Sequence, residues 1–106
     1  MVINQYSIYW INLDPVIGSE VSKTRPCVVI SPDEMNKFLR TVISAPLTHT
    51  LKPYPSRVKC DINGDESMIM LDQLKTVDKS RLISFFARLN TTESDAIKTV
   101  INEMLC

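Results

Sequence analysis

The sequence predicts a mostly β protein of the α+β class, a small and strongly bent antiparallel barrel with short connecting helices and a C-terminal helix. Short strand-like runs recur along the chain and are separated by turn residues. One long segment near the C-terminus instead has its apolar residues at helical spacing. A chain of 106 residues suits one domain, which we expect to span residues 1–106.

Four strands are expected in the first part of the chain. Aromatic and aliphatic side chains alternate over residues 6–13, and β-branched residues fill residues 28–31. Further strand-like runs cover residues 41–46 and 57–60. Residues 32–38 begin with a proline followed by acidic residues, a pattern that favours a short helical turn.

A hairpin, another strand and a helix are expected in the remaining chain. The Asn-Gly-Asp turn at residues 63–65 returns the chain into a strand over residues 67–71. A further strand covers residues 83–89. Thr91 or Thr92 is expected to cap the final helix. The apolar stripe of this helix consists of Ala96, Ile97, Val100, Ile101, Met104 and Leu105.

The formal net charge is zero, which weakens a purely electrostatic argument for nucleic-acid binding. The charges are unevenly distributed, however. Residues 1–60 hold seven Lys or Arg against four Asp or Glu, whereas residues 61–106 hold five against eight. A basic face of this size could hold a short single strand, and a solvated surface of mixed charge would give the same pattern.

Neither a signal peptide nor a membrane-spanning run is evident, and we expect a cytoplasmic protein. The three cysteines are far apart and lack any C-x-x-C pairing. Cys27 and Cys60 lie in strand-like contexts and are interpreted as small core residues. With one histidine and no clustered thiols, no metal site and no cofactor are expected.

A polar loop ends at Arg25-Pro26 and is followed at once by an apolar run. Pro26 fixes its own φ and biases Arg25 toward an extended backbone, so the guanidinium is expected at a rigid strand edge. A forked, permanently charged donor held in this way suits a phosphate or a carboxylate. On local sequence alone, an ordinary surface arginine beside a loop is the favoured interpretation.

Several segments match one known family in order and spacing. They are residues 8–15, 18–20, 24–31, 45–48, 52–55 and 71–82. On these segments the chain resembles the MazF/PemK-type toxins of bacterial toxin–antitoxin systems across nearly its whole length. The family usually has a glycine where Ser7 stands here, and this chain contains few glycines. Neither departure affects the proposed chemistry.

The resemblance implies a homodimeric SH3-like barrel that acts as a metal-independent endoribonuclease. Such toxins cut single-stranded RNA, chiefly mRNA, at short sequences and thereby inhibit translation and growth. A cognate antitoxin restrains them by inserting a disordered acidic segment into the RNA groove. The two catalytic positions of the family fall on Arg25 and Thr48.

The side chains at these positions fit attack of the RNA 2′-OH on the adjacent phosphorus, which gives 2′,3′-cyclic phosphate and 5′-OH ends. Arg25 would neutralise the phosphorane and Thr48 would add a hydroxyl donor. Arginine is a poor general base, so Glu20 is a further catalytic candidate, as a base or as a group that orients Arg25. An exposed loop carboxylate is the alternative for Glu20. His49 follows Thr48, and strand alternation would aim it away from the phosphate, at the rim of the site.

Binding of RNA bases is expected from residues that can stack or donate and accept hydrogen bonds. The candidates are Lys23, Asn36, His49, Lys52, Tyr54, Arg57, Asp72 and Gln73. For Tyr54, stiffening of the loop is an equally good interpretation. For Asp72 and Gln73, the alternative is that their side chains hydrogen-bond to the local backbone. Two other functions stay open: a non-catalytic CcdB-like toxin that binds and poisons DNA gyrase, and an interaction module that holds an acidic peptide.

Overall fold

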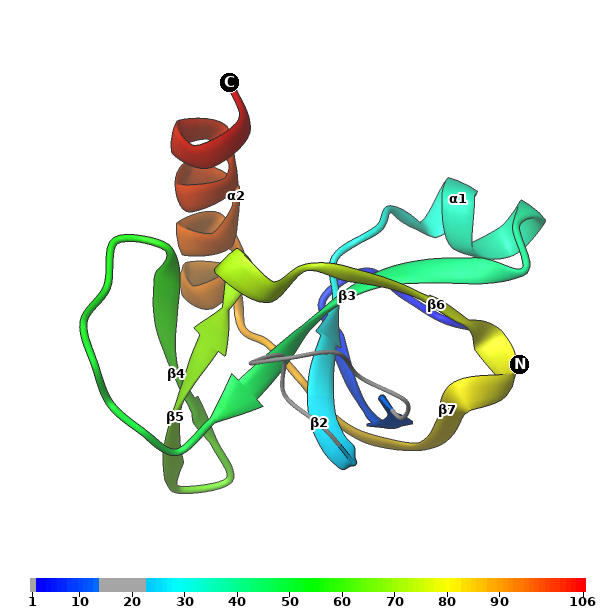
Figure 1. The fold of residues 1–106 in the computed structure, drawn as a ribbon, viewed down its shortest axis with the longest axis horizontal. Coiled ribbons are helices and arrows are strands. Elements are labelled where there is room, and N and C mark those ends of the chain that lie inside the picture. The colour runs from blue at the N-terminus through cyan, green and yellow to red at the C-terminus, as the bar shows by residue number, and fades with distance from the viewer. Residues whose placement is uncertain (1, 14–22) are drawn as a thin grey trace.

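The computed structural model describes residues 2–13 and 23–106, as seven strands, two α-helices and two short 3₁₀ turns (Figure 1). In chain order the elements are β1 (Ser7–Asn12), β2 (Thr24–Val29), α1 (Asp33–Phe38), β3 (Thr41–Thr48), β4 (Arg57–Ile62), β5 (Asp65–Met70), η1 (Leu71–Gln73), β6 (Lys75–Asp78), η2 (Lys79–Arg81), β7 (Leu82–Arg88) and α2 (Thr91–Leu105).

The strands form one curled antiparallel sheet in the order β4-β5-β3-β2-β1-β7, with β6 also paired to β3. The long strand β3 changes partners along its length, and this bends the sheet. Its residues 41–44 pair with β6, whereas Leu47 and Thr48 pair with β5. The mostly β barrel with a C-terminal helix is therefore confirmed.

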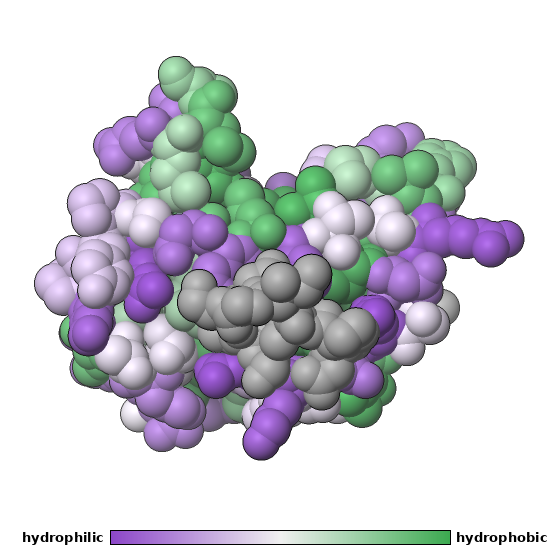
Figure 2. Space-filling model, viewed as in Figure 1, coloured by the Kyte–Doolittle hydropathy of each residue, from purple (hydrophilic) through white to green (hydrophobic). Residues whose placement is uncertain are grey.

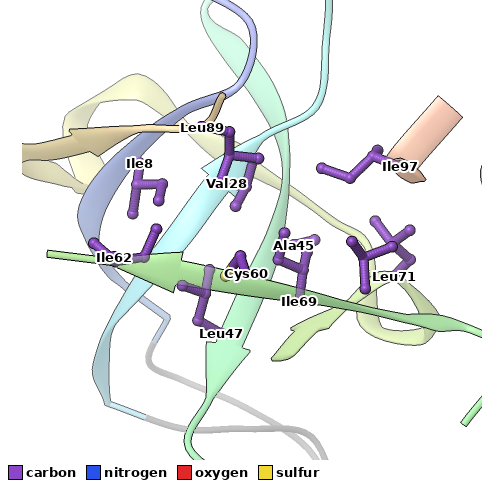
Figure 3. Close-up of a cluster of buried hydrophobic side chains, with 11 residues drawn as sticks. Ile8, Val28, Ala45, Leu47, Cys60, Ile62, Ile69, Leu71, Leu89 and Ile97 are labelled. Atoms are coloured by element: carbon purple, nitrogen blue, oxygen red, sulfur yellow. The ribbon is translucent and has the colours of Figure 1, made fainter. Parts of the chain in front are cut away.

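Two groups of buried side chains hold the sheet in this shape. The larger group lies where β1, β2, β3, β4 and β5 converge beneath α2, and Figure 3 shows Ile97 of α2 pointing toward it. The second group lies under β1, β2, β3 and β6 and includes Ile11, Cys27 and Val42. Cys27 and Cys60 are both buried, as expected for core residues. On the face drawn in Figure 2, apolar surface gathers on α2 and around α1.

Local chemistry explains most element ends. Asn63 and Gly64 form the turn between β4 and β5 with φ values of 54° and 93°, which fits the Asn-Gly preference of two-residue hairpins. The N-cap of α2 is Asn90, not Thr91 or Thr92. Its side chain accepts from the Glu93 N–H at 2.8 Å while Glu93 accepts from the Asn90 N–H at 3.0 Å, a reciprocal capping box.

Three other features differ from the sequence expectations. Strand β2 begins at Thr24 because β1 pairs with it as far as Asn12. Strand β6 was not expected from the sequence, and of its four residues only Val77 is buried. On β7, Ile83 and Phe85 are exposed, and the pairing with β1 contains register shifts.

Among the helices described, none is long and apolar enough to cross a membrane.

Candidate active site

Strand register brings the two expected catalytic positions to one face of the sheet. Strands β2 and β3 pair with Val28 opposite Ala45 and Cys27 opposite Pro46. Strand β2 reaches back to Thr24 and β3 runs on to Thr48, so extending this register by two residues would set Arg25 opposite Thr48. Residues two apart in a strand share a face, so both side chains lie on the face of Cys27 and Pro46.

A hollow on the reverse face supports this register. Pro26 and Leu47, the next pair in the same register, line it together. Strand alternation therefore separates two surfaces at this edge: Arg25 and Thr48 on one, Pro26 and Leu47 on the other.

Arg25 is half-buried near the start of β2, next to the buried Cys27 face. Burial raises the pKa of the neighbouring Cys27 thiol to about 12, and the positive charge of Arg25 opposes part of that rise. Cys27 is therefore a neutral thiol, and its Sγ lies 3.5 Å from the Arg25 carbonyl oxygen. The thiol contributes no nucleophile to the site.

Thr48 is half-buried at the end of β3. Its hydroxyl oxygen accepts a hydrogen bond from the Thr50 N–H at 3.2 Å. This contact holds the oxygen in place and leaves the hydroxyl hydrogen available to donate to a phosphate.

The same face continues from Thr48 across two more strands. Thr48 pairs with Met68 of β5, and Met68 pairs with Lys59 of β4. Neighbouring strands are about 4.8 Å apart, so Lys59 lies about 10 Å from Thr48 along this row. Arg57 shares the face of Lys59 because it is two residues earlier in β4. We call Arg25, Thr48, Met68 and Lys59 the Thr48 row.

The loop between β3 and β4 runs outside the β4–β5 hairpin (Figure 1) and carries an aromatic and charged cluster. The Arg57 guanidinium lies over the Tyr54 ring, with its Cζ 4.8 Å from the ring centroid. The Arg57 Nε donates to Asp72 Oδ1 at 3.3 Å, and the Ser56 hydroxyl donates to the same oxygen at 3.2 Å. Burial alone would raise the pKa of Asp72, but hydrogen bonds, chiefly the one from Arg57, outweigh it and leave the pKa below its usual value.

Beside this cluster is a hollow of about 360 Å³, lined by Leu51, Pro53, Tyr54, Arg57, Lys59 and Met68. Lys59 and Met68 thus belong both to the hollow and to the Thr48 row. Neither residue was among the sequence candidates for RNA binding. The alternation of β4 and β5 is the signal that would have placed them on the face of Thr48.

His49 lies on the opposite surface from Thr48, as strand alternation predicted. It lines the reverse-face hollow of about 200 Å³ with Pro26, Leu47, Asp65 and other residues. Trp10 and Phe86 also border this hollow, and their rings are 5.3 Å apart. His49 is exposed, and its place in the reverse-face hollow directs it away from the face of Arg25 and Thr48.

Asn36 is only 3% exposed, which argues against its expected role as a base reader. Its amide nitrogen donates to the carbonyls of Ile3 and Ser31, and its amide oxygen accepts from the Ser31 hydroxyl. Through these hydrogen bonds, the Asn36 side chain joins α1 to the N-terminal segment. Its role in the structure is to satisfy buried backbone groups.

The other candidates are more accessible or undescribed. Lys52 is exposed, and so is Lys23, which has a φ of 67°. Gln73 is half-buried, with its amide nitrogen 4.0 Å from the Met70 sulfur. Glu20 lies outside the described residues. Within residues 2–13 and 23–106, no three His, Cys, Asp or Glu side chains are grouped so as to hold a metal ion.

Comparison with known proteins agrees with this geometry. The sequence model of the PemK-like, MazF-like toxins of type II toxin–antitoxin systems matches residues 4–105. The endoribonuclease EndoA of Bacillus subtilis is 32% identical over 103 residues, covering 92% of this chain and 89% of that protein.

Solved structures show the same fold. MazF from Deinococcus radiodurans matches with a TM-score of 0.87 at 23% identity, covering 99% of this chain and 97% of that one. A mycobacterial endoribonuclease, solved in complex with its cognate antitoxin, matches with a TM-score of 0.83 at 17% identity, covering 97% and 94%. Since the family's sequence model spans nearly the whole chain, this protein belongs to the PemK-like, MazF-like toxins of type II toxin–antitoxin systems.

Proposed function

We propose that this protein is an endoribonuclease toxin that cleaves single-stranded RNA. The observation that supports the proposal is the pairing of β2 with β3 through Cys27 and Pro46, because its continuation would bring Arg25 and Thr48 to one face. Family membership and the similarity to a protein named as an endoribonuclease support the same activity. The basic residues Arg57 and Lys59 extend this face, as a single-stranded polyanion requires.

The proposed reaction uses the nucleophile that RNA itself carries. The 2′-oxygen attacks the adjacent phosphorus as its proton leaves, the bond from phosphorus to the 5′-oxygen breaks, and that oxygen takes up a proton. The products are a 2′,3′-cyclic phosphate and a 5′-OH, and the reaction is proposed to be independent of metal ions.

Arg25 is assigned the role of a phosphate clamp. Its forked guanidinium can bind two non-bridging oxygens and neutralise the charge that grows on them in the phosphorane. The Thr48 hydroxyl is proposed to donate a hydrogen bond to the same phosphate and thereby to orient the phosphate for in-line attack. Glu20 stays the proposed proton acceptor, because arginine side chains remain protonated and His49 lies on the reverse face.

The proposed partners follow from the same surface. A structural neighbour is described as an endoribonuclease bound to its cognate antitoxin. We propose that this toxin is likewise restrained by an antitoxin, whose disordered acidic segment occupies the basic face in place of RNA. A homodimer is expected from the family resemblance, and the RNA substrate places the proposed activity in the cytoplasm.

The test is cleavage of a mixed RNA pool in the presence of EDTA, with sequencing of the new 5′ ends. Arg25→Ala is expected to lower the rate by about 10²-fold or more, as loss of a group that stabilises the transition state does. Thr48→Ala should also lose most activity, whereas Thr48→Ser keeps the hydroxyl and should keep most of the rate. Arg88→Ala is the matched control, because it removes an exposed arginine from β7 at the other edge of the sheet.

Two outcomes would contradict the assignment. If His49→Ala lost as much activity as Arg25→Ala, the catalytic pair would have to be redrawn. If the RNA pool stayed intact while DNA gyrase was inhibited, the non-catalytic CcdB-like function would be favoured instead.

A further inference from the structure

The Tyr54–Arg57–Asp72 cluster has the features of a preorganised binding subsite. Arg57 is held from two sides, by the Tyr54 ring under its guanidinium and by the Asp72 carboxylate at its Nε. Its side chain is only 14% exposed, whereas Tyr54 is 49% exposed. The arginine is therefore fixed, and the aromatic ring beside it still offers surface to a ligand.

The contacts of Arg57 leave its strongest donors unused. Asp72 engages only the Nε, and among the described residues neither terminal amino group of Arg57 makes a hydrogen bond. A guanidinium stacked on an aromatic ring with two amino groups available can bind a phosphate while it stays in place. Asp72 by contrast already accepts two hydrogen bonds on one oxygen, from Arg57 and Ser56.

The cluster also lies next to the proposed site of cleavage. Met68 lines the hollow beside Tyr54 and is the direct cross-strand partner of Thr48. Such partners have Cβ atoms about 5 Å apart, so the hollow begins one strand away from Thr48. Lys59 at its far side adds a second positive charge, which Glu66 approaches to 3.3 Å.

We propose that this hollow binds the nucleotide next to the scissile phosphate and that Asp72 is a positioning residue that holds Arg57 against Tyr54. The base stacks on Tyr54, with Leu51 and Pro53 as an apolar wall, and the phosphate meets Arg57 and Lys59. Asp72 then acts through Arg57 and does not read a base edge. This inference rests on the proposed function, since it assumes that the ligand is single-stranded RNA.

A double-mutant cycle separates the two roles of Asp72. In the wild-type background, Asp72→Asn is expected to raise KM for RNA about fivefold with kcat within about twofold, because an exposed ion pair of this kind contributes little more. In an Arg57→Ala background the same substitution should have no further effect. A carboxylate that read a base directly would instead cost affinity in both backgrounds and change the cleaved sequence.

The direction in which Asp72→Asn changes the affinity for RNA is a second readout. Removing a negative charge from a surface that binds RNA tightens binding if charge is all that matters. The positioning role predicts weaker binding from Asp72→Asn despite the lost charge, and an unchanged slope of log affinity against log salt. Arg57→Ala should reduce that slope by about one. Asp95→Asn, which removes an exposed carboxylate from α2, is the matched control.

Tyr54 tests the stacking arm of the proposal. Tyr54→Phe keeps the ring and should bind RNA as the wild type does, whereas Tyr54→Leu should lose about tenfold or more in affinity. Equal affinities for the two variants would overturn the stacking role. Thermal unfolding of each variant shows whether a loss of binding comes from a loss of fold.

Binding is measured by fluorescence anisotropy with a pool of 2′-O-methyl oligonucleotides, which cannot be cleaved by 2′-OH attack. If the wild type binds the pool but cleaves no RNA, the proposed catalysis fails while the Tyr54 and Asp72 variants still decide the subsite. If the wild type does not bind the pool at all, the subsite is refuted. If Asp72→Asn binds as tightly as the wild type or more tightly, the positioning role is refuted.

Discussion

Glu93 is a residue for which the structure predicts a large loss of stability on substitution. Its carboxylate is 9% exposed and accepts two backbone hydrogen bonds, from the Asp61 N–H at 2.8 Å and from the Asn90 N–H at 3.0 Å. One of these bonds closes the cap of α2, and the other fastens that helix to β4. Glu93→Ala removes both acceptors together.

The magnitude follows from the groups left behind. A buried donor that loses its acceptor costs about 1–3 kcal/mol, and the Asp61 N–H lies in a part-buried position. Adding the loss of the capping bond gives about 3 kcal/mol of unfolding free energy for Glu93→Ala. In a domain of this size, that corresponds to a fall in Tm of roughly 12–24 °C. Glu93→Gln keeps one acceptor oxygen and should lose about half as much.

The measurement is urea and thermal unfolding followed by circular dichroism and Trp10 fluorescence. Asp95→Ala is the control, because Asp95 is also near the start of α2 but is exposed and makes only a 3.8 Å contact with Lys98. That control should fall within about 0.5 kcal/mol of the wild type. If Glu93→Ala unfolded within the same margin, the two hydrogen bonds would not be what fastens α2 to the sheet.

Two further predictions concern buried groups. Asn36→Ala should cost about 2–4 kcal/mol of stability, because the carbonyls of Ile3 and Ser31 lose a donor and the Ser31 hydroxyl loses its acceptor. The cleaved RNA sequence should stay unchanged, and an altered sequence at unchanged Tm would restore Asn36 as a base reader. Burial raises the thiol pKa of Cys27 and of Cys60 to about 12, so the thiolate is scarce below that pH. Both thiols should react with a disulfide reagent at pH 8 only as the protein unfolds, whereas the exposed Cys106 should react at once. Three equally fast thiols in the folded protein would contradict this prediction.

Much of the fold was predictable because its signals are local. Alternation predicted β1 and β7, the Asn-Gly turn predicted the β4–β5 hairpin, and the spacing of apolar residues predicted α2. The errors occur where a distant partner decides the outcome. Strand β6 forms because β3 pairs with it, and its four residues carry almost no pattern of their own. The Asn90 cap is an exception, because the Asn-x-x-Glu pattern of its capping box is local and could have been recognised from residues 90–93.

The candidate site was predictable in its residue types and not in their grouping. The position of Arg25 before a proline, followed by an apolar run, predicted an arginine at a strand edge, and Arg25 lies half-buried in β2. The burial of Asn36 and the attachment of Asp72 to Arg57 depend on contacts across α1 and across the β4–β5 hairpin. No local pattern around either residue distinguishes a side chain that meets RNA from one that supports the fold.

The core and the proposed catalytic pair are set by the same register. Val28 and Ala45 are opposite each other and fully buried, so β2 and β3 cannot slip by one residue without exposing apolar side chains to solvent. Any such slip would also move Arg25 to the opposite face from Thr48. The hydrophobic packing that stabilises the sheet therefore also fixes the two strands that carry Arg25 and Thr48. If these residues bind a phosphate as proposed, their relative position is set by the core before RNA binds.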